Sequence, residues 1–141
     1  MTYEEWFLKQ GELHANVMKK LVNKTDDEVI EYFRFENMVK NEPDFCPLYK
    51  DNKKCHDYEK LNCYLCACPN FRFKMEGFEK TEDGKTLFSV CNIKSKDGAQ
   101  YIGEDYIHQN CSGCIVPHRE KYIKNHFNRN WFEVMKDVRG K

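Results

Sequence analysis

The feature that most constrains this chain is the spacing of its eight cysteines. Two Cys-x2-Cys pairs, Cys63/Cys66 and Cys111/Cys114, lie far apart in the sequence. A two-residue spacer in a tight turn directs both sulfurs toward one point, and Zn²⁺ takes four such ligands in a tetrahedron at about 2.3 Å. Two such pairs in one chain indicate metal binding. The other four cysteines are Cys46, Cys55, Cys68 and Cys91.

Two histidines extend the set of candidate ligands. His56 directly follows Cys55, and His118 comes four residues after Cys114. Eight thiols and two imidazoles are more ligands than one mononuclear site can use, so we expect two metal ions. Zinc is favoured because it accepts both thiolate and imidazole. One partition groups the two Cys-x2-Cys pairs and leaves the other ligands for a second site, but the sequence does not choose among partitions.

An iron–sulfur cluster is the main alternative to zinc. The run Cys63-x2-Cys66-x-Cys68-Pro69 brings three thiols close together before a proline, as one ferredoxin run also does. Such a cluster implies a redox or catalytic role. A metal carrier or sensor is a further alternative, which would need exchangeable binding. A disulfide scaffold is disfavoured, because closely spaced cysteines make awkward bridges and we expect a reducing compartment.

Length and composition predict one globular domain, residues 1–141. The chain is 33% charged and 14% aromatic, which suits a polar surface around a core of bulky side chains. No apolar run approaches the roughly 18 residues that a membrane-spanning helix needs. Glu4 and Glu5 stand where a secretory signal would need a basic start. We therefore expect a cytoplasmic protein without membrane contact.

Residues 1–42 are expected to form a helical N-terminal extension of two helices. Thr2 with Glu5, and Thr25 with Glu28, each fit a capping box, in which hydroxyl and carboxylate satisfy free backbone N–H groups at a helix start. Apolar residues then recur at helical spacing. His14 lies close to the first apolar stripe, and we interpret it as a polar residue at the boundary of the core.

Residues 44–118 form the predicted cysteine-rich metal-binding core. From Asp44 to Asn70 the chain has neither helical nor strand periodicity, so we expect metal coordination to order it. Segments 71–73, 86–93 and 100–107 are predicted strands of a small antiparallel sheet, with turns at Asp83-Gly84 and Asp97-Gly98. Residues 117–138 are a predicted C-terminal helix, which Asn128 to Asn130 would interrupt. The expected fold class is α+β.

At these residues the chain resembles the cysteine-rich small-domain, zinc-finger-like family of compact prokaryotic proteins. The resemblance covers about residues 45–125 and depends on Cys55-His56 and on the runs 62–69 (NCYLCACP) and 110–118 (NCSGCIVPH). Cys46 and Cys91 match further cysteines of the pattern. The resemblance implies metal binding through these cysteines and histidines, and no established reaction.

The expected function is metal binding, with two structural zinc sites supporting an interaction surface. The net charge is zero, but residues 1–45 carry ten acids and six bases, whereas residues 117–141 carry seven bases and three acids. We expect a protein partner, or nucleic acid at the basic C-terminal segment. An enzyme is less expected, because no catalytic motif is present. The carboxylates nearest in sequence to the candidate ligands are Asp57, Glu59, Glu104 and Asp105.

Overall fold

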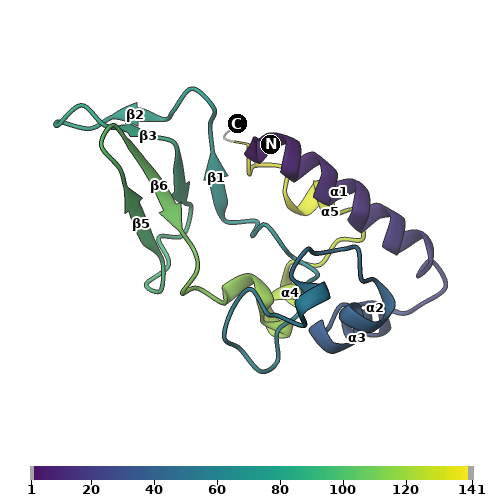
Figure 1. Cartoon of the computed structure of the whole chain (residues 1–141). Helices are drawn as coiled ribbons and strands as arrows, with labels where there is room; N and C mark the ends of the chain where they lie inside the picture. Colours follow the sequence, from purple (N-terminus) through teal and green to yellow (C-terminus); the bar gives the residue numbers. More distant parts are fainter. Residues whose placement is uncertain (1, 140–141) are drawn as a thin grey trace.

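The computed structural model describes residues 2–139 and has an α+β fold, as the sequence predicts. The N-terminal helices are α1 (Tyr3–Lys19), α2 (Asp26–Tyr32) and α3 (Phe35–Asn41), and the C-terminal helices are α4 (Glu120–Asn125) and α5 (Trp131–Val134). Two short 3-10 helices, η1 (Tyr49–Asp51) and η2 (Val116–His118), lie in the central segment. Figure 1 shows the helices on one side of the molecule and most of the strands on the other.

The N-terminal region confirms both predicted capping boxes but contains three helices where two were expected. The hydroxyl oxygens of Thr2 and Thr25 accept hydrogen bonds from the backbone N–H groups of Glu5 and Glu28. The carboxylates of Glu5 and Glu28 accept in turn from the backbone N–H groups of the two threonines. The extra break falls at Arg34, whose extended backbone forms an isolated bridge with Asn62. This bridge ties the helical region to the start of the Cys63/Cys66 pair.

One hydrophobic core joins the helices to the central segment. Phe7 and Val17 of α1 pack in the same cluster as Tyr64 and Leu65 of the cysteine-rich segment and Val138 near the C-terminus. The central segment therefore has buried apolar side chains that the sequence did not predict, because they follow no helical or strand periodicity. Their burial contributes to the order of this segment alongside any metal. The buried anchors from residues 44–70 are Phe45, Tyr49, Leu61, Cys63, Tyr64 and Leu65.

His14 lies inside this core, and its interpretation as a boundary residue is wrong. The side chain is fully buried, with its ring stacked 4.9 Å from Phe33 and edge-on to Tyr64 at 4.6 Å. Neither ring nitrogen makes a well-formed hydrogen bond within residues 2–139. Burial lowers the pKa of His14 to about 3, against a smaller opposing effect of the Tyr64 backbone. The ring therefore fills the core as a neutral aromatic group.

The strands form two sheets instead of the single antiparallel sheet predicted. Strands β1 (Phe71–Phe73) and β4 (Ser89–Cys91) make an antiparallel pair. Strands β2 (Glu79–Lys80), β3 (Thr86–Leu87), β6 (Tyr106–Asn110) and β5 (Ala99–Ile102) make a mixed sheet in that order, with β3 parallel to β6. In Figure 1, β1 lies between this mixed sheet and α1.

Two of the three predicted strands change in the structure, whereas the prediction for 71–73 is confirmed. Segment 86–93 divides into β3 and β4, since each half pairs with a different sheet. Segment 100–107 contains the turn of the β5–β6 hairpin, where the Gly103 N–H bonds to the Tyr106 carbonyl. The predicted turn at Asp83-Gly84 lies between β2 and β3, with Gly84 at φ +83°.

The C-terminal segment 117–138 is helical in two short pieces, α4 and α5, and not in one helix. The interruption falls where the asparagines predicted it: Asn128 accepts from the backbone of Asn130, which in turn caps α5 through Phe132 N–H. Ile123, Trp131 and Val138 are nevertheless all buried. The prediction of a C-terminal helix with an interruption at the asparagines is therefore confirmed, with two short helices on either side of the break.

The basic C-terminal segment lies against the acidic N-terminal helices. Arg129 approaches Asp26 at 2.8 Å, Lys124 approaches Asp27 at 3.5 Å, and Arg139 approaches Glu4 at 3.4 Å. The opposite charge bias of the two chain ends is thus partly matched within the molecule. Between residues 2 and 139, no helix has the length and apolar character that crossing a membrane requires.

Candidate metal centre

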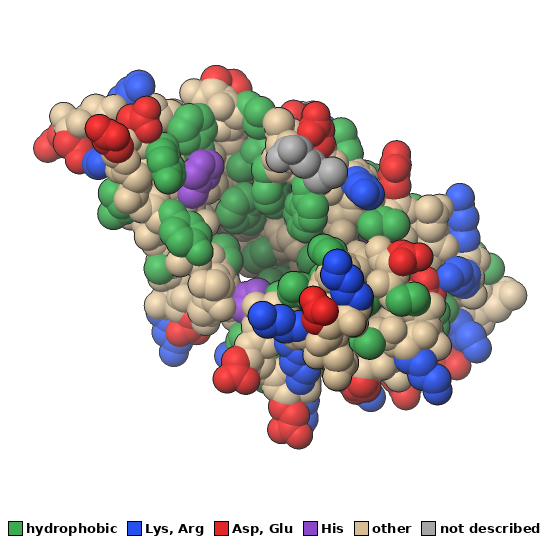
Figure 2. Space-filling view, viewed as in Figure 1, with side chains coloured by type: hydrophobic (Ala, Val, Ile, Leu, Met, Phe, Trp, Pro, Cys, Tyr) green, Lys and Arg blue, Asp and Glu red, His purple; other side chains and the backbone are tan. Residues whose placement is uncertain are grey.

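A cavity of about 250 Å³ lies between the helical side of the molecule and the strands. Figure 2 shows this face hollowed, with mostly green side chains in its walls, a colour that includes cysteine and tyrosine. Six of the eight cysteines and both candidate histidines line the cavity: Cys55, Cys66, Cys68, Cys91, Cys111, Cys114, His56 and His118. The fold thus collects ligands that are spread over more than sixty residues of sequence.

Cys55, His56 and His118 form the tightest group of metal-ligand atoms. One ligand atom from each lies within 4.8 Å of the other two, and within residues 2–139 no other group of three meets this criterion. The Cys55 Sγ is 3.1 Å from His56 Nδ1 and 3.8 Å from His118 Nε2. The two imidazole rings lie 4.7 Å apart, centroid to centroid.

Backbone carbonyls fix the tautomer of both histidines. His56 Nε2 lies 2.8 Å from the Cys111 carbonyl, and His118 Nδ1 lies 2.9 Å from the Asn62 carbonyl. A carbonyl oxygen only accepts, so each of these nitrogens carries the proton. The other nitrogens, His56 Nδ1 and His118 Nε2, keep free lone pairs directed at the Cys55 sulfur. Metal-binding histidines are oriented in the same way, with the remote N–H donated to a carbonyl or carboxylate.

Burial keeps His118 neutral and available as a ligand. It lowers the pKa of His118 to about 4, partly opposed by the hydrogen bond to Asn62 and reinforced by His56. The ring is 4% exposed and is held by η2, where the His118 N–H bonds to the Ile115 carbonyl. Proline at the second position of η2 suits this start, because it needs no donor there. The cavity therefore presents an unprotonated imidazole nitrogen near neutral pH.

The thiols fall into two electrostatic groups. The first thiol set consists of Cys46, Cys55, Cys63 and Cys66. Burial raises the pKa of Cys55 to about 11 and that of Cys63 to about 12, and neighbouring thiols of the same set raise both further. The pKa of Cys66 is raised by burial first and then by the other three members of the set.

The second thiol set consists of Cys68, Cys91, Cys111 and Cys114. Burial raises the pKa of Cys68 to about 12; the Asn70 backbone N–H opposes this, and the other three thiols of the set add to it. Burial raises the pKa of Cys111 to about 11, with further contributions from Cys114 and Cys91. Without a cation the Cys68 and Cys111 thiols stay protonated, whereas a metal ion would offset both burial and mutual repulsion.

Both Cys-x2-Cys pairs are shaped by the asparagine that precedes them. Asn62 Oδ1 accepts from the Tyr64 N–H at 2.9 Å, and Asn110 Oδ1 accepts from the Ser112 N–H at 3.0 Å. Each asparagine thereby closes a turn two residues on, and the second cysteine of each pair bonds back to the carbonyl of the first. Both runs that support the family resemblance begin with this asparagine, but the sequence analysis did not predict its role in the turn.

Asn62 is the main positioning residue that sequence reasoning missed. Its side chain is fully buried and donates to the Ile30 carbonyl at 2.7 Å and to Glu120 at 3.1 Å. Its backbone N–H and carbonyl both bond to His118. Asn62 thus connects α2, the first Cys-x2-Cys pair and His118. Glu120 is held in turn by two hydrogen bonds from Arg34.

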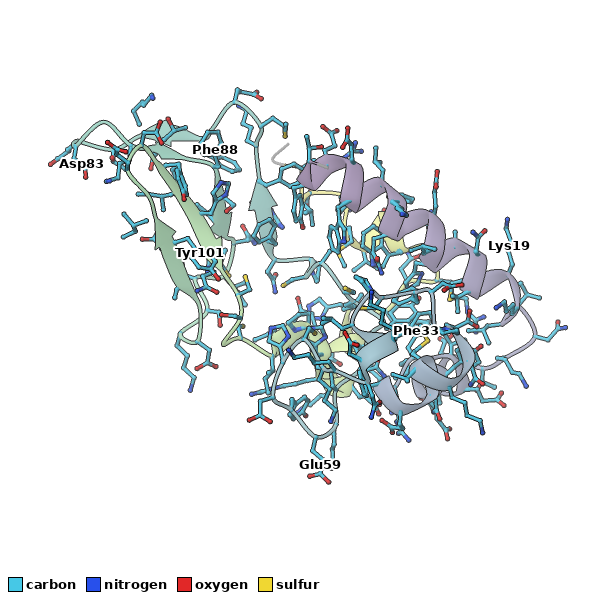
Figure 3. All side chains as sticks on the ribbon, viewed as in Figure 1. Lys19, Phe33, Glu59, Asp83, Phe88 and Tyr101 are labelled. Atoms are coloured by element: carbon cyan, nitrogen blue, oxygen red, sulfur yellow. The ribbon has the colours of Figure 1, made fainter. Side chains whose placement is uncertain are left out.

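The carboxylates closest in sequence to the ligands do not reach the cavity. Asp57, Glu59, Glu104 and Asp105 are exposed, and none of them lines it. Figure 3 shows Glu59 at the outer tip of its loop, pointing away from the molecule. Within residues 2–139 the cavity wall contains no carboxylate, so it offers no acidic general base of the kind that zinc hydrolases use.

Comparisons of the chain with protein-family models, with curated proteins and with solved structures return no match. We therefore infer the function from the chemistry of the site itself.

Proposed function

We propose that this protein binds two zinc ions through its cysteines and histidines, and that these ions stabilise its interaction surface. The observation that carries the proposal is the arrangement of Cys55, His56 and His118. Two imidazoles have their protons fixed on backbone carbonyls and their free nitrogens directed at one thiol. A protein that used these residues only for packing would have no need to align three donor atoms within 4.8 Å.

The donor set fits zinc. Thiolate and neutral imidazole are the ligands of structural zinc sites, and the described residues place six thiols and two imidazoles around one cavity. All eight cysteines are free thiols, as expected for the cytoplasm that we propose as the location. The same residues carry the resemblance to the cysteine-rich small-domain family, and we propose that the chain belongs to it.

We propose a structural role for the ions. The cavity ligands come from the loop at 55–56, the turn at 66–68, the end of β4 and the segment 111–118. These segments lie mainly outside the hydrophobic core. Coordination would close these loops on one another and stabilise the junction between helices and strands. The missing carboxylate in the cavity wall favours this role over hydrolysis.

We propose a protein partner rather than nucleic acid. Three of the seven basic side chains of the C-terminal segment, Lys124, Arg129 and Arg139, already face acids of α1 and α2, which leaves less positive charge for phosphates. The mixed sheet exposes aromatic and aliphatic side chains instead: Tyr101 is 57% exposed and Ile102 is 65% exposed. Both are on β5, an edge strand, where partners add by backbone pairing.

The test is metal analysis of protein purified without oxygen, together with its absorption spectrum. We expect about two zinc ions per chain and no visible colour. His118→Ala should lose one ion, whereas His126→Ala, which changes an exposed histidine outside the cavity, should keep both. Iron with inorganic sulfide would establish the iron–sulfur alternative. A well-folded protein with no metal after zinc has been supplied would refute metal binding.

A further inference from the structure

Strand pairing brings two cysteines of the second thiol set together. In the parallel β3–β6 pair Leu87 faces Ile107, and two hydrogen bonds keep the next residues beside β6: the Phe88 N–H bonds to the Ile107 carbonyl, and the Gln109 N–H bonds to Ser89 Oγ. Cys91 is the last residue of β4 and Cys111 directly follows β6, and both line the cavity. The cysteines thus stand where β4 and β6 end, on neighbouring segments.

Cys68 reaches the same point from the other side of β4. Cys91 faces Phe71 in the β1–β4 pair, and the Phe71 N–H bonds to the Cys68 carbonyl at 3.1 Å. The backbone turns sharply here: Ala67 has φ +90° and Cys68 has φ +52°, a left-handed conformation that side-chain-bearing residues rarely adopt. This turn separates Cys66, in the first thiol set, from Cys68, in the second.

Ser95 connects Cys91 to Cys114, the fourth member. Its backbone N–H donates to Cys91 Sγ at 3.4 Å, and its hydroxyl lies 3.1 Å from Cys114 Sγ. Hydrogen bonds from N–H and O–H groups to sulfur stabilise a thiolate and orient it. Asn110 shapes the turn that carries Cys111 and Cys114.

From this geometry we propose that Cys68, Cys91, Cys111 and Cys114 form a separate four-thiolate site for one zinc ion, distinct from the centre at Cys55, His56 and His118. The inference rests on the proposed function and specifies its ligands. It replaces the partition in which the two Cys-x2-Cys pairs share one ion.

Binding is a ligand exchange with no change of oxidation state. Each of the four thiols would give up its proton as it forms one S–Zn bond, so up to four protons would leave for solvent and the site would take a net charge of −2. The backbone and hydroxyl donors at Ser95 and the backbone N–H of Asn70 face this charge. All four cysteines line the cavity, and within residues 2–139 no three of their sulfurs lie within 4.8 Å of one another, so the side chains would have to move toward the ion as it binds.

Native mass spectrometry of the full-length, zinc-loaded chain distinguishes the two partitions through double variants. Cys68→Ser with Cys111→Ser removes two ligands of one proposed site, so one zinc should remain. Cys55→Ser with Cys68→Ser removes a ligand from each site, so none should remain. The partition in which the Cys-x2-Cys pairs share an ion predicts the reverse for both variants, and that reversed result would overturn our assignment while leaving zinc binding intact.

A second measurement uses the unmodified protein and so avoids variants that fail to fold. Zinc is withdrawn slowly with a chelator, the thiols that become free are alkylated, and the labelled peptides are identified. We expect all four thiols of the second set to be labelled together, in one phase, with Cys55 labelled in another. Labelling of Cys111 in step with Cys55 would contradict the proposal. Failure of the wild-type chain to take up any zinc would refute the proposed function as well.

Discussion

His14 makes the stability of this protein depend on pH in a way that one substitution should abolish. The ring is fully buried among Phe33, Tyr64 and Trp131 without a well-formed hydrogen bond, and burial lowers its pKa to about 3. In the unfolded chain the pKa returns to its ordinary value of about 6.5. The unfolded state therefore binds the proton more tightly, and stability falls as the pH drops below about 6.5.

The size of the effect follows from these two pKa values. Between about pH 7.5 and about pH 5.5, protonation of the unfolded state should cost the native protein about 1.4 kcal/mol. The loss continues to grow until the pH approaches the folded pKa of about 3. Leucine at position 14 keeps the site filled with apolar atoms and removes the titrating group, so His14→Leu should lack this component.

Urea unfolding followed by tryptophan fluorescence at both pH values measures the difference, since Trp131 lies 6.1 Å from the His14 ring. Other groups, His118 among them, also titrate, so the quantity of interest is the wild-type loss minus the His14→Leu loss. Phe33→Leu is the matched control: it alters the packing around His14 and should lower stability by about 1 kcal/mol at both pH values. Equal pH dependence in wild type and His14→Leu would refute the reasoning.

Three further predictions test other parts of the structure. Asn62→Ala leaves the Ile30 carbonyl and the Tyr64 N–H without their buried partners. It should lower the free energy of unfolding in urea by about 2–4 kcal/mol and weaken zinc binding about tenfold or more in a chelator competition. The control variant Asn125→Ala, at an exposed position, should change neither quantity. Thr25→Ala removes the N-cap of α2 and should lower the unfolding free energy by about 1 kcal/mol, read from the urea midpoint. Removal of metal should speed amide hydrogen exchange in β4 and β6 while α1 stays protected, and uniform exchange throughout the chain would contradict a separate hydrophobic core.

The parts of the fold that local chemistry decides were predictable from the sequence. Each capping box is complete within four residues, so Thr2 and Thr25 could be assigned without knowledge of distant contacts. The strands at 86–93 and 100–107 were placed but misdivided, because pairing partners from elsewhere in the chain determine where each strand ends. His14 was misplaced for the same reason: its burial depends on aromatic rings brought from positions 33, 64 and 131.

The candidate ligands were predictable by type, and their grouping was not. Spacing within a Cys-x2-Cys pair shows that two sulfurs can meet, but it says nothing about which distant residues join them. The sequence analysis grouped Cys63/Cys66 with Cys111/Cys114 as one partition and left the choice open, whereas in the structure Cys63 and Cys68 have different thiol neighbours although only four residues separate them in the chain. The left-handed turn at Ala67 and Cys68 directs Cys66 and Cys68 to different groups of thiols, and no local pattern in the sequence predicts this turn.

The structure also narrows the structural role that the proposed metal ions would have. If coordination alone ordered residues 44–70, this segment would carry few buried apolar side chains, yet Tyr64 and Leu65 are fully buried between the two cysteines of the first pair. The apolar core thus fixes Cys63 and Cys66 before any ion binds, and Asn62 fixes His118 in the same way. By contrast, Cys91 ends β4 and Cys111 directly follows β6, and all four cysteines of the second thiol set lie outside the hydrophobic core cluster. A site held by the core should bind metal with little rearrangement, whereas the site at the strand ends should couple binding to the ordering of the sheet.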